Sequence, residues 1–132
     1  MTDMPPSTRN EIQRFPSSLP LPFSRAVRAG GFLFLSGQIP MDGEGKVVRG
    51  DIAAQTHVTM DRIGESLALA GASFNDVVKA TVWLSDLSLF QQFNEVYQSY
   101  FPQGFPVRSA VEAKLAFGVD VEVEVQAWLG GK

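Results

Sequence analysis

The segment 119–128, VDVEVEVQAW, constrains the fold more than any other part of the chain. Every second residue is Val or Ala, and the residues between them are Asp, Glu, Gln and Trp. Successive side chains of a β-strand point to opposite faces of a sheet, so this alternation predicts a strand with one apolar face and one acidic face. The sheet that contains this strand therefore packs one face against a core and carries acids on the other.

Other segments also have the composition of strands. Two glycines at 30 and 31 supply the turn of a hairpin between strands over 25–28 and 32–36. β-branched and aromatic residues predict strands over 77–84 and 108–115. With 119–128 and a short segment near 47–48, the chain is expected to form about six strands.

Two segments have the period of amphipathic helices. Apolar residues spaced by three and four predict a helix that begins after Asp51, its N-cap, and stops at Gly71. A second helix is expected over 89–100, where Ser88 and Gln91 have the spacing of a capping box. The mixture of strands and helices predicts an α+β domain with a mixed sheet and both helices on one face.

The length of the chain suits a single domain, because 132 residues are enough to bury one core. We expect residues 1–15 to form an N-terminal tail and a first short strand, and residues 16–132 to form the α+β domain. Two helices cover one sheet face, and the other face would expose apolar side chains in a monomer. A homo-oligomer is therefore expected, with ligand sites in the clefts between subunits.

Composition and charge disfavour several kinds of site. The chain has no cysteine, so it forms no disulfide and no thiolate site, and the one histidine, His57, is expected at a solvated helix edge rather than on a metal. The net charge of −3 argues against nucleic-acid binding, and Arg9, Arg14, Arg25 and Arg28 are expected on a solvated surface. No apolar run reaches the roughly 18 residues that span a bilayer, and the polar N-terminus is unlike a signal peptide, so a cytoplasmic protein is expected.

Motifs for nucleophilic or nucleotide chemistry are weak. Ser36-Gly37-Gln38 is not the Gly-x-Ser-x-Gly turn that exposes a nucleophile, and no phosphate-binding loop of standard spacing occurs. Arg108 is the residue that the strand pattern explains least, since a guanidinium costs several kcal/mol to desolvate alone. Spacing leaves two partners open: an acid of the last strand, Glu122 or Glu124, or an anionic ligand.

Eight short motifs occur in a fixed order over about residues 20–128: PFS at 22–24, LSGQIP at 35–40, DIAAQT at 51–56, AGAS at 70–73, DVVKATV at 76–82, FNEVY at 93–97, PVRS at 106–109 and VEVE at 121–124. By these collinear motifs the chain as a whole resembles the YjgF/RidA family of reactive-intermediate deaminases. This resemblance implies a chorismate-mutase-like fold, a homotrimer with sites between subunits, and no cofactor. It also implies hydrolysis of 2-imino acids and their enamine tautomers to 2-keto acids and ammonia.

The resemblance assigns roles to individual positions. Arg108 matches the arginine that binds the substrate carboxylate, and Glu122 matches the acid linked to water activation. Ser36 matches the serine of the family's Ser-Gly-Gln motif, and Asn94 matches a helix asparagine near the ligand. The expected catalytic residues are thus Arg108, Glu122 and Ser36, and the expected substrate-binding residues are Arg108, Asn94, Phe23, Gly37 and Ala110.

Three departures from the family pattern bear on substrate and rate. Many active relatives have Tyr in place of Phe23 and Cys in place of Ala110, and segment 114–119 departs from the usual Leu-Pro-Lys-Asp turn. The missing hydroxyl at Phe23 favours an alternative, a non-catalytic trimer that binds small carboxylate metabolites. Some relatives are named for RNA cleavage, which the acidic balance and the lack of a second histidine disfavour here.

Overall fold

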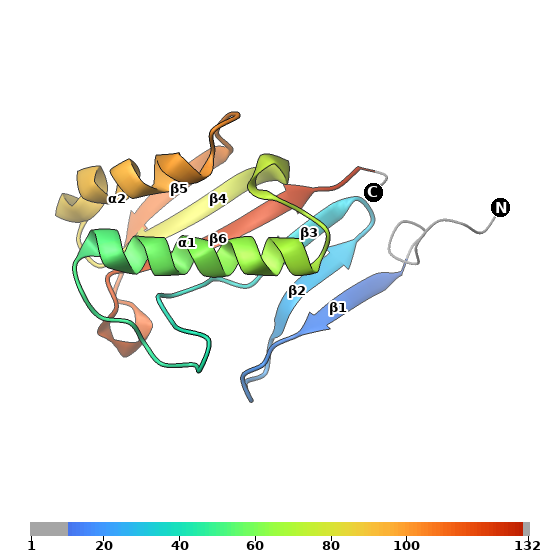
Figure 1. Ribbon diagram of the computed structural model, residues 1–132, viewed down its shortest axis with the longest axis horizontal. Coiled ribbons are helices and arrows are strands. Elements are labelled where there is room, and N and C mark those ends of the chain that lie inside the picture. The colour runs from blue at the N-terminus through green and yellow to red at the C-terminus, as the bar shows by residue number, and fades with distance from the viewer. Residues whose placement is uncertain (1–10, 131–132) are drawn as a thin grey trace.

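The computed structural model describes residues 11–130, so the expected tail at residues 1–10 lies outside the described part of the chain. A six-stranded sheet runs in the order β1-β2-β3-β6-β4-β5 (Figure 1). Only the β4–β5 pair is parallel among these neighbours. The strands are β1 Ile12–Pro16, β2 Ser24–Ala29, β3 Phe32–Leu35, β4 Val77–Leu84, β5 Val107–Glu112 and β6 Val121–Trp128.

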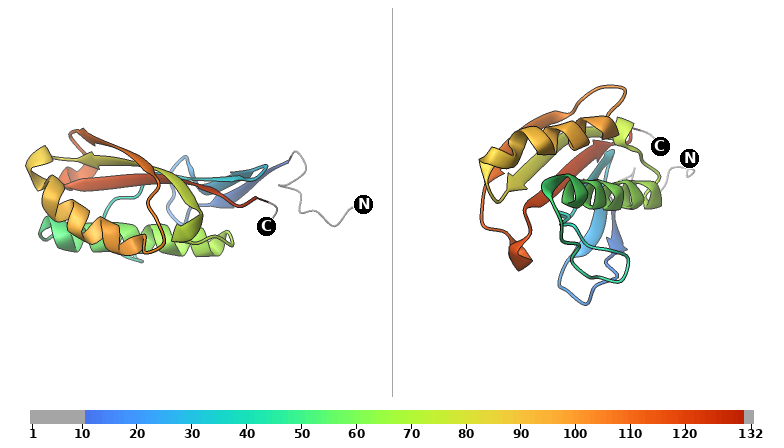
Figure 2. Two further views of the ribbon diagram at one scale, coloured as in Figure 1. Left: turned by 90° about the horizontal axis from the view of Figure 1, so that it is seen from above. Right: turned by 60° about the vertical axis from the view of Figure 1, so that its left-hand side comes forward.

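Two α-helices, α1 Ile52–Leu69 and α2 Phe90–Tyr97, lie on the same face of the sheet (Figure 2, left). Short 3-10 helices occupy Phe74–Asp76, Leu87–Leu89, Gln98–Tyr100 and Ala116–Gly118. The predicted α+β fold, a mixed sheet with both helices on one face, is confirmed. Between residues 11 and 130, no helix is long and apolar enough to cross a bilayer.

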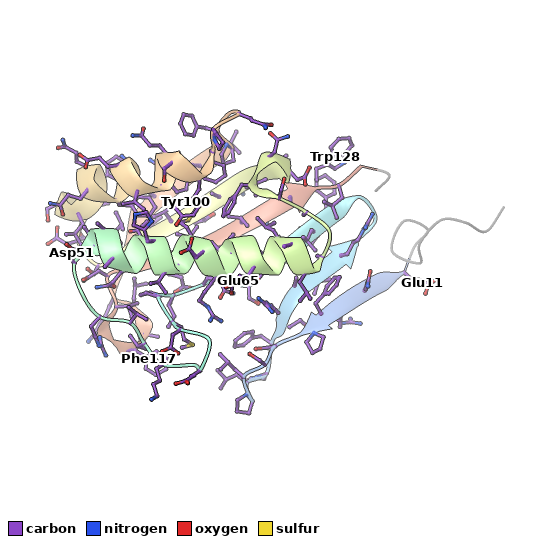
Figure 3. The ribbon with its side chains drawn as sticks, viewed as in Figure 1. Glu11, Asp51, Glu65, Tyr100, Phe117 and Trp128 are labelled. Atoms are coloured by element: carbon purple, nitrogen blue, oxygen red, sulfur yellow. The ribbon has the colours of Figure 1, made fainter. Side chains whose placement is uncertain are left out.

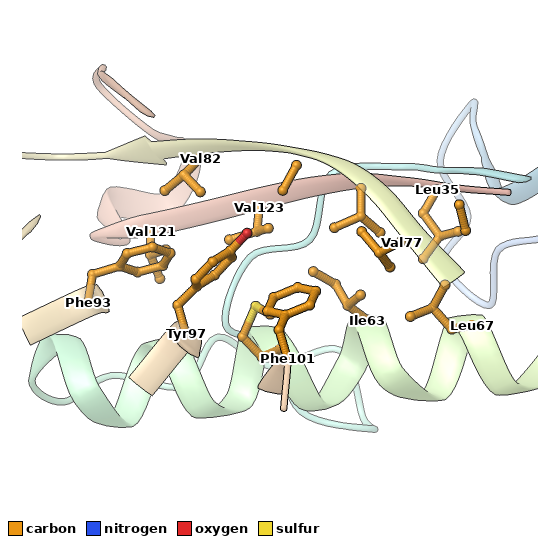
Figure 4. Close-up of a cluster of buried hydrophobic side chains, with 14 of the residues drawn as sticks. Leu35, Ile63, Leu67, Val77, Val82, Phe93, Tyr97, Phe101, Val121 and Val123 are labelled. Carbon is orange, nitrogen blue, oxygen red and sulfur yellow. The ribbon is translucent and has the colours of Figure 1, made fainter. Parts of the chain in front are cut away.

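The core fills the space between the helices and the sheet. Figure 4 shows side chains of α1 and α2 pointing toward the strands, among them Ile63, Leu67, Phe93 and Tyr97. The alternate residues of β6, Val121, Val123, Val125 and Ala127, are fully buried. The apolar face predicted for this strand is therefore its core face, and Glu122 and Glu124 lie on the opposite face.

The observed helix ends test the predicted capping residues. The Asp51 carboxylate accepts a hydrogen bond of 2.9 Å from the Ala54 amide, which confirms the predicted N-cap. Gly71 follows α1 with φ of 81°, the left-handed conformation that a glycine stop adopts. The prediction that Ser88 caps the second helix is wrong. The Asp86 carboxylate accepts from the Ser88 amide at 2.8 Å, so Ser88 lies inside a 3-10 turn and α2 begins at Phe90.

Several strand boundaries differ from those expected. β5 ends at Glu112 rather than 115, because the chain leaves the sheet after the Ala113 amide donates to the Leu84 carbonyl. Val47 forms only an isolated bridge with Met41. β1 pairs with β2 from Ile12↔Ala29 to Pro16↔Ser24, and the expected division of the chain at residue 16 stays a prediction.

Candidate functional site

Arg108 lies on the helix-covered face of the sheet. It is level with Ala80 of β4, which is level with Val125 of β6, and both of these are fully buried in the core. Its NH1 donates to Asn94 Oδ1 of α2 at 2.8 Å. Its Cζ lies 5.2 Å, 6.0 Å and 5.0 Å from three ring centroids of α2, those of Phe90, Phe93 and Tyr97. The helix thus holds the guanidinium by one hydrogen bond and by cation–π contacts.

No carboxylate within residues 11–130 forms an ion pair with Arg108. A hollow of about 290 Å³ opens beside the guanidinium and is lined by Asn94, Tyr97, Gln98, Phe105, Pro106 and Arg108. The Tyr97 hydroxyl is buried without a hydrogen-bond partner in the described structure, and burial raises the pKa of this phenol while the charge of Arg108 partly opposes the shift. We call Arg108, Asn94 and this hollow the arginine half-site.

Glu122 lies on the other face of the sheet, level with Trp83 of β4. Burial is the main cause that raises the pKa of this carboxyl, and the negative charge of Glu124 adds to it. The segment around Gly37 runs beside it, because Gln38 forms an antiparallel bridge with Val123 through hydrogen bonds of 2.8 Å and 3.0 Å. A Cβ at Gly37 would collide with the Glu122 carboxylate, so any other residue at 37 would require this carboxylate to move from its present position.

A second hollow, of about 350 Å³, lies around Glu122 and Gly37. Its wall also includes Phe23, whose side chain is 44% exposed, and Phe117. We call Glu122, Gly37, Phe23 and this hollow the glutamate half-site. Figure 3 shows Glu65 and Phe117, both from its wall, on the same side of α1.

Two arginines in the wall of the glutamate half-site were missed by the sequence analysis. Arg25, expected on a solvated surface, is half-buried, and its Nε donates to Ser66 Oγ at 2.8 Å. Arg62 donates to Gln38 Oε1 at 3.2 Å and to the carbonyls of Met41 and Asp42 at 3.2 Å and 3.0 Å. Arg28 is also buried, so the solvated-surface interpretation is wrong for Arg25 and Arg28. The alternation of strand β2 could have indicated the burial of Arg28, because this residue pairs with buried Leu33.

Two other predicted residues, Ser36 and Ala110, have contacts of a different kind. The Ser36 hydroxyl donates to the Ser24 carbonyl at 2.6 Å, which ties β3 to the start of β2. Ala110 lies two residues beyond Arg108 on the same face and packs against the core beside Val82. Within one chain, the structure therefore brings Arg108 to Asn94 and brings Glu122 to Gly37 and Phe23, but it places these two groups on opposite faces of the sheet.

The single histidine belongs to a separate surface cluster. His57 is exposed, as predicted, and its Nδ1 lies 3.0 Å from the hydroxyl of Tyr100, which donates to Asp61 Oδ1 at 2.7 Å. Burial, and then the Asp61 carboxylate, raises the pKa of Tyr100. The same hydroxyl lies 3.3 Å from the His57 carbonyl, and the direction of its contact with Nδ1 depends on the tautomer of the ring. In the described range, no three His, Cys, Asp or Glu residues gather as metal ligands.

Comparison with known proteins identifies the family. The model of a family described as endoribonuclease L-PSP matches residues 16–129. The chain belongs to the endoribonuclease L-PSP family. This is the YjgF/RidA family that the sequence motifs resemble, so the predicted family is confirmed.

Named members of the L-PSP family agree with this assignment over most of their length. The RutC family protein of Pyrococcus abyssi is 48% identical over 109 residues, which cover 81% of this chain and 86% of that protein. A human 2-iminobutanoate/2-iminopropanoate deaminase is 40% identical over 111 residues, covering 83% and 81%. The crystal structure of the Rid-family protein YyfA from Yersinia pestis superposes with a TM-score of 0.81 at 36% identity, covering 87% and 93%. The predicted chorismate-mutase-like fold is confirmed by such neighbours.

Proposed function

We propose that this protein is a hydrolytic deaminase that converts 2-imino acids and their enamine tautomers to 2-keto acids and ammonia. The observation that carries the proposal is Arg108, a half-buried guanidinium that is oriented by Asn94, faces a hollow and has no carboxylate partner among residues 11–130. An arginine held in this way suits the carboxylate of a small acid. The name of the human relative supports the substrate class.

The proposed active site combines half-sites from two neighbouring copies in a homotrimer. One chain cannot place Arg108 and Glu122 on one small substrate, because these side chains lie on opposite faces of the sheet. The face without helices also exposes Phe32, Phe34 and Trp128, with Phe32 level with Trp128 across β3 and β6. Apolar residues on an open sheet face favour contact with another copy.

In the proposed reaction, Arg108 binds the substrate carboxylate and the partner copy's Glu122 lies near the imine carbon. The substrate reacts as its iminium ion, whose nitrogen already carries the extra proton. Glu122 accepts a proton from water as the water oxygen bonds to the carbon of C=N and the π electrons move to nitrogen, which becomes a neutral amino group. Glu122 then returns that proton to the nitrogen of the resulting carbinolamine. The C–N bond breaks, ammonia departs, and the hydroxyl proton passes to the Glu122 carboxylate and on to solvent, which leaves the 2-keto acid.

The local structure fits these roles. The pKa of Glu122 is raised, so its carboxylate is a stronger base than an ordinary glutamate while it still ionises. Asn94 positions Arg108, and Ser36 positions the segment that contains Gly37 through its bond to Ser24. No metal or other cofactor takes part in the proposed reaction, and the expected cytoplasmic location remains a prediction.

The first experiment measures the decay of imino acids released by an amino-acid oxidase, with and without the protein. We expect wild type to accelerate decay, Arg108→Ala to lose this effect, and Glu122→Gln to lose turnover while still binding 2-ketobutyrate. Equal turnover in either variant contradicts the role of that residue.

A subunit-mixing experiment tests whether the site is shared. When Arg108→Ala and Glu122→Gln chains are unfolded together and refolded as mixed trimers, about a quarter of the sites receive both native half-sites if neighbours share each site around a closed ring. Activity near a quarter of wild type is expected from two inactive parents. If mixed trimers form but activity does not recover, either both residues act within the site of one chain or one of them has no role in the mechanism.

A binding protein without turnover is the second candidate, and Phe23 favours it. This side chain lines the glutamate half-site and offers no hydroxyl to a ligand. Binding of 2-ketobutyrate without any effect on imine decay would select this function. RNA cleavage, which the family description mentions, is disfavoured by the net charge of −3, and salt-dependent RNA binding and cleavage by the purified protein would reverse that preference.

A further inference from the structure

Phe117 has an unusual backbone conformation. Its φ is 59° and its ψ is 14°, and it is the one non-glycine residue with positive φ between residues 11 and 130. A bulky aromatic side chain makes this left-handed conformation unfavourable, and such strain persists only where the surroundings enforce it. Strained residues cluster at ligand sites, so the position of this side chain needs an explanation.

The backbone around Phe117 is held by polar contacts rather than by packing of its ring. Arg49 NH1 donates to the Phe117 carbonyl at 2.8 Å, and the Gly118 amide donates to Leu115 at 3.3 Å. Gly118 itself has φ of 68°, so two consecutive residues are left-handed. Phe117 is 64% exposed and is not part of the core cluster. The strain therefore brings no burial of this ring within the chain.

The ring instead forms part of the wall of the glutamate half-site. Phe23 and Leu21, which are 44% and 52% exposed, belong to the same wall, and Glu122 contributes the carboxylate. Exposed apolar side chains around a concave site that holds one working acid suit a ligand that is apolar beside its reacting group. At about 350 Å³, the hollow is also larger than a methyl or ethyl substituent requires.

We propose that Phe117 and Phe23 form the pocket for the substrate side chain and select imino acids with large apolar or aromatic side chains. This inference rests on the proposed function, because it places the carboxylate at Arg108 and the imine carbon near Glu122. The side chain then extends along the wall that carries both phenyl rings. The turn at 114–119 thereby becomes a specificity element, separate from the residues that bind the carboxylate and activate water.

The charged residues of the same wall favour an apolar over an acidic side chain. Arg62 is engaged by three acceptors of its own chain, namely Gln38 Oε1 and the carbonyls of Met41 and Asp42. Arg25 donates to Ser66, and Glu65 brings a negative charge to the same wall. A second substrate carboxylate would therefore compete with existing hydrogen bonds and meet two acids, Glu65 and Glu122.

The test compares imino acids made by an oxidase from alanine, leucine, phenylalanine and glutamate. Wild type is expected to have a higher kcat/KM for the leucine- and phenylalanine-derived substrates than for the alanine-derived one. Phe117→Gly suits the observed φ and should keep the turn. It is expected to lower kcat/KM for the two large substrates about 10-fold or more relative to the alanine-derived one. Leu69→Ala removes an exposed apolar side chain that lines neither hollow, and it should leave the ratio unchanged.

The outcomes separate this inference from the proposed function. A ratio that is the same in wild type and Phe117→Gly, or a preference for the glutamate-derived substrate, overturns the inference while leaving deamination intact. If Phe117→Gly breaks the assembly with an unchanged ratio, the ring serves an interface and the inference is also wrong. If wild type accelerates no imine, the proposed function fails, and calorimetric binding of phenylpyruvate and pyruvate then tests the pocket independently. Tighter binding of phenylpyruvate that is lost in Phe117→Gly would support the pocket, and equal binding of both acids would overturn it.

Discussion

Replacing Asn94 by Asp should weaken the binding of a ligand carboxylate, because a carboxylate of the protein itself would then pair with Arg108. Asn and Asp have nearly the same shape, so the new carboxylate oxygen would lie where Asn94 Oδ1 now accepts from Arg108 at 2.8 Å. The neutral amide orients the guanidinium and leaves its charge available. An aspartate would pair with that charge directly, and an incoming carboxylate would have to compete with it.

The size of the effect follows from the distance and from the exposure of the pair. Two unit charges about 4 Å apart interact by about 1 kcal/mol in water and about 4 kcal/mol in a protein-like surrounding, and solvent screening favours the lower end for side chains that are half exposed. A competing interaction of about 1 to 2 kcal/mol corresponds to roughly 5- to 30-fold weaker ligand binding. The same pair should raise the melting temperature of the free protein at low salt, and added salt should reduce the gain.

Isothermal titration calorimetry with 2-ketobutyrate measures the affinity, and thermal unfolding at low and high salt measures the stability. Gln98→Glu is the matched control, because Gln98 lines the same hollow on the same side of the molecule but makes no hydrogen bond to Arg108 in the described structure. It adds the same charge and should reduce affinity less than Asn94→Asp. Wild-type affinity in Asn94→Asp, or an equal loss in both variants, would refute the reasoning that Arg108 binds the carboxylate in the orientation set by Asn94.

Three further predictions follow from the site and the fold. Burial raises the pKa of Glu122, so the folded state holds this proton more tightly than the unfolded chain and ionisation opposes folding. Glu122→Gln should therefore be more stable than wild type at pH values above the raised pKa and equally stable below the ordinary glutamate pKa. Urea midpoints of the two proteins that differ by the same amount at every pH would contradict this prediction. If Glu122 is the base, activity should fall as pH falls through the raised pKa of this carboxyl. Glu124→Gln should move this decline to lower pH, because it removes a nearby negative charge and so lowers the pKa of Glu122. A pH–rate profile of Glu124→Gln that matches wild type argues against a role for Glu122. Asp51→Ala should lower the free energy of unfolding by about 1 kcal/mol by removing the N-cap of α1, as urea unfolding would measure, and an unchanged midpoint would show that the cap is redundant.

The elements that were predictable from sequence are those with a strong local period. Strand β4 has the expected bounds, and the buried alternate residues of β6 follow directly from VDVEVEVQAW. The N-cap at Asp51 was also recognisable, because its side chain acts on an amide three residues away. Ser88 was misassigned because Asp86, two residues earlier, competes for the same turn, and spacing gives no measure of which side chain wins.

The arrangement of the site could not be predicted in the same way. Spacing within a strand shows which residues share a face, but it does not show which face the helices cover. Arg108 and Glu122 both looked like members of one sheet site, yet the pairing of β4 with β5 and β6 puts them on opposite faces. Phe117 gave no signal either, since the following Gly118 is the residue from which a left-handed turn would be expected.

The close approach of Gly37 to Glu122 has a consequence for how this site can change. A side chain at 37 would require the Glu122 carboxylate to leave its present position, so the two positions constrain each other. In a library of variants selected for imine turnover, substitutions at 37 should therefore be about as rare as substitutions at 122. A chain with another residue at 37 is expected to hold the acid in a different place.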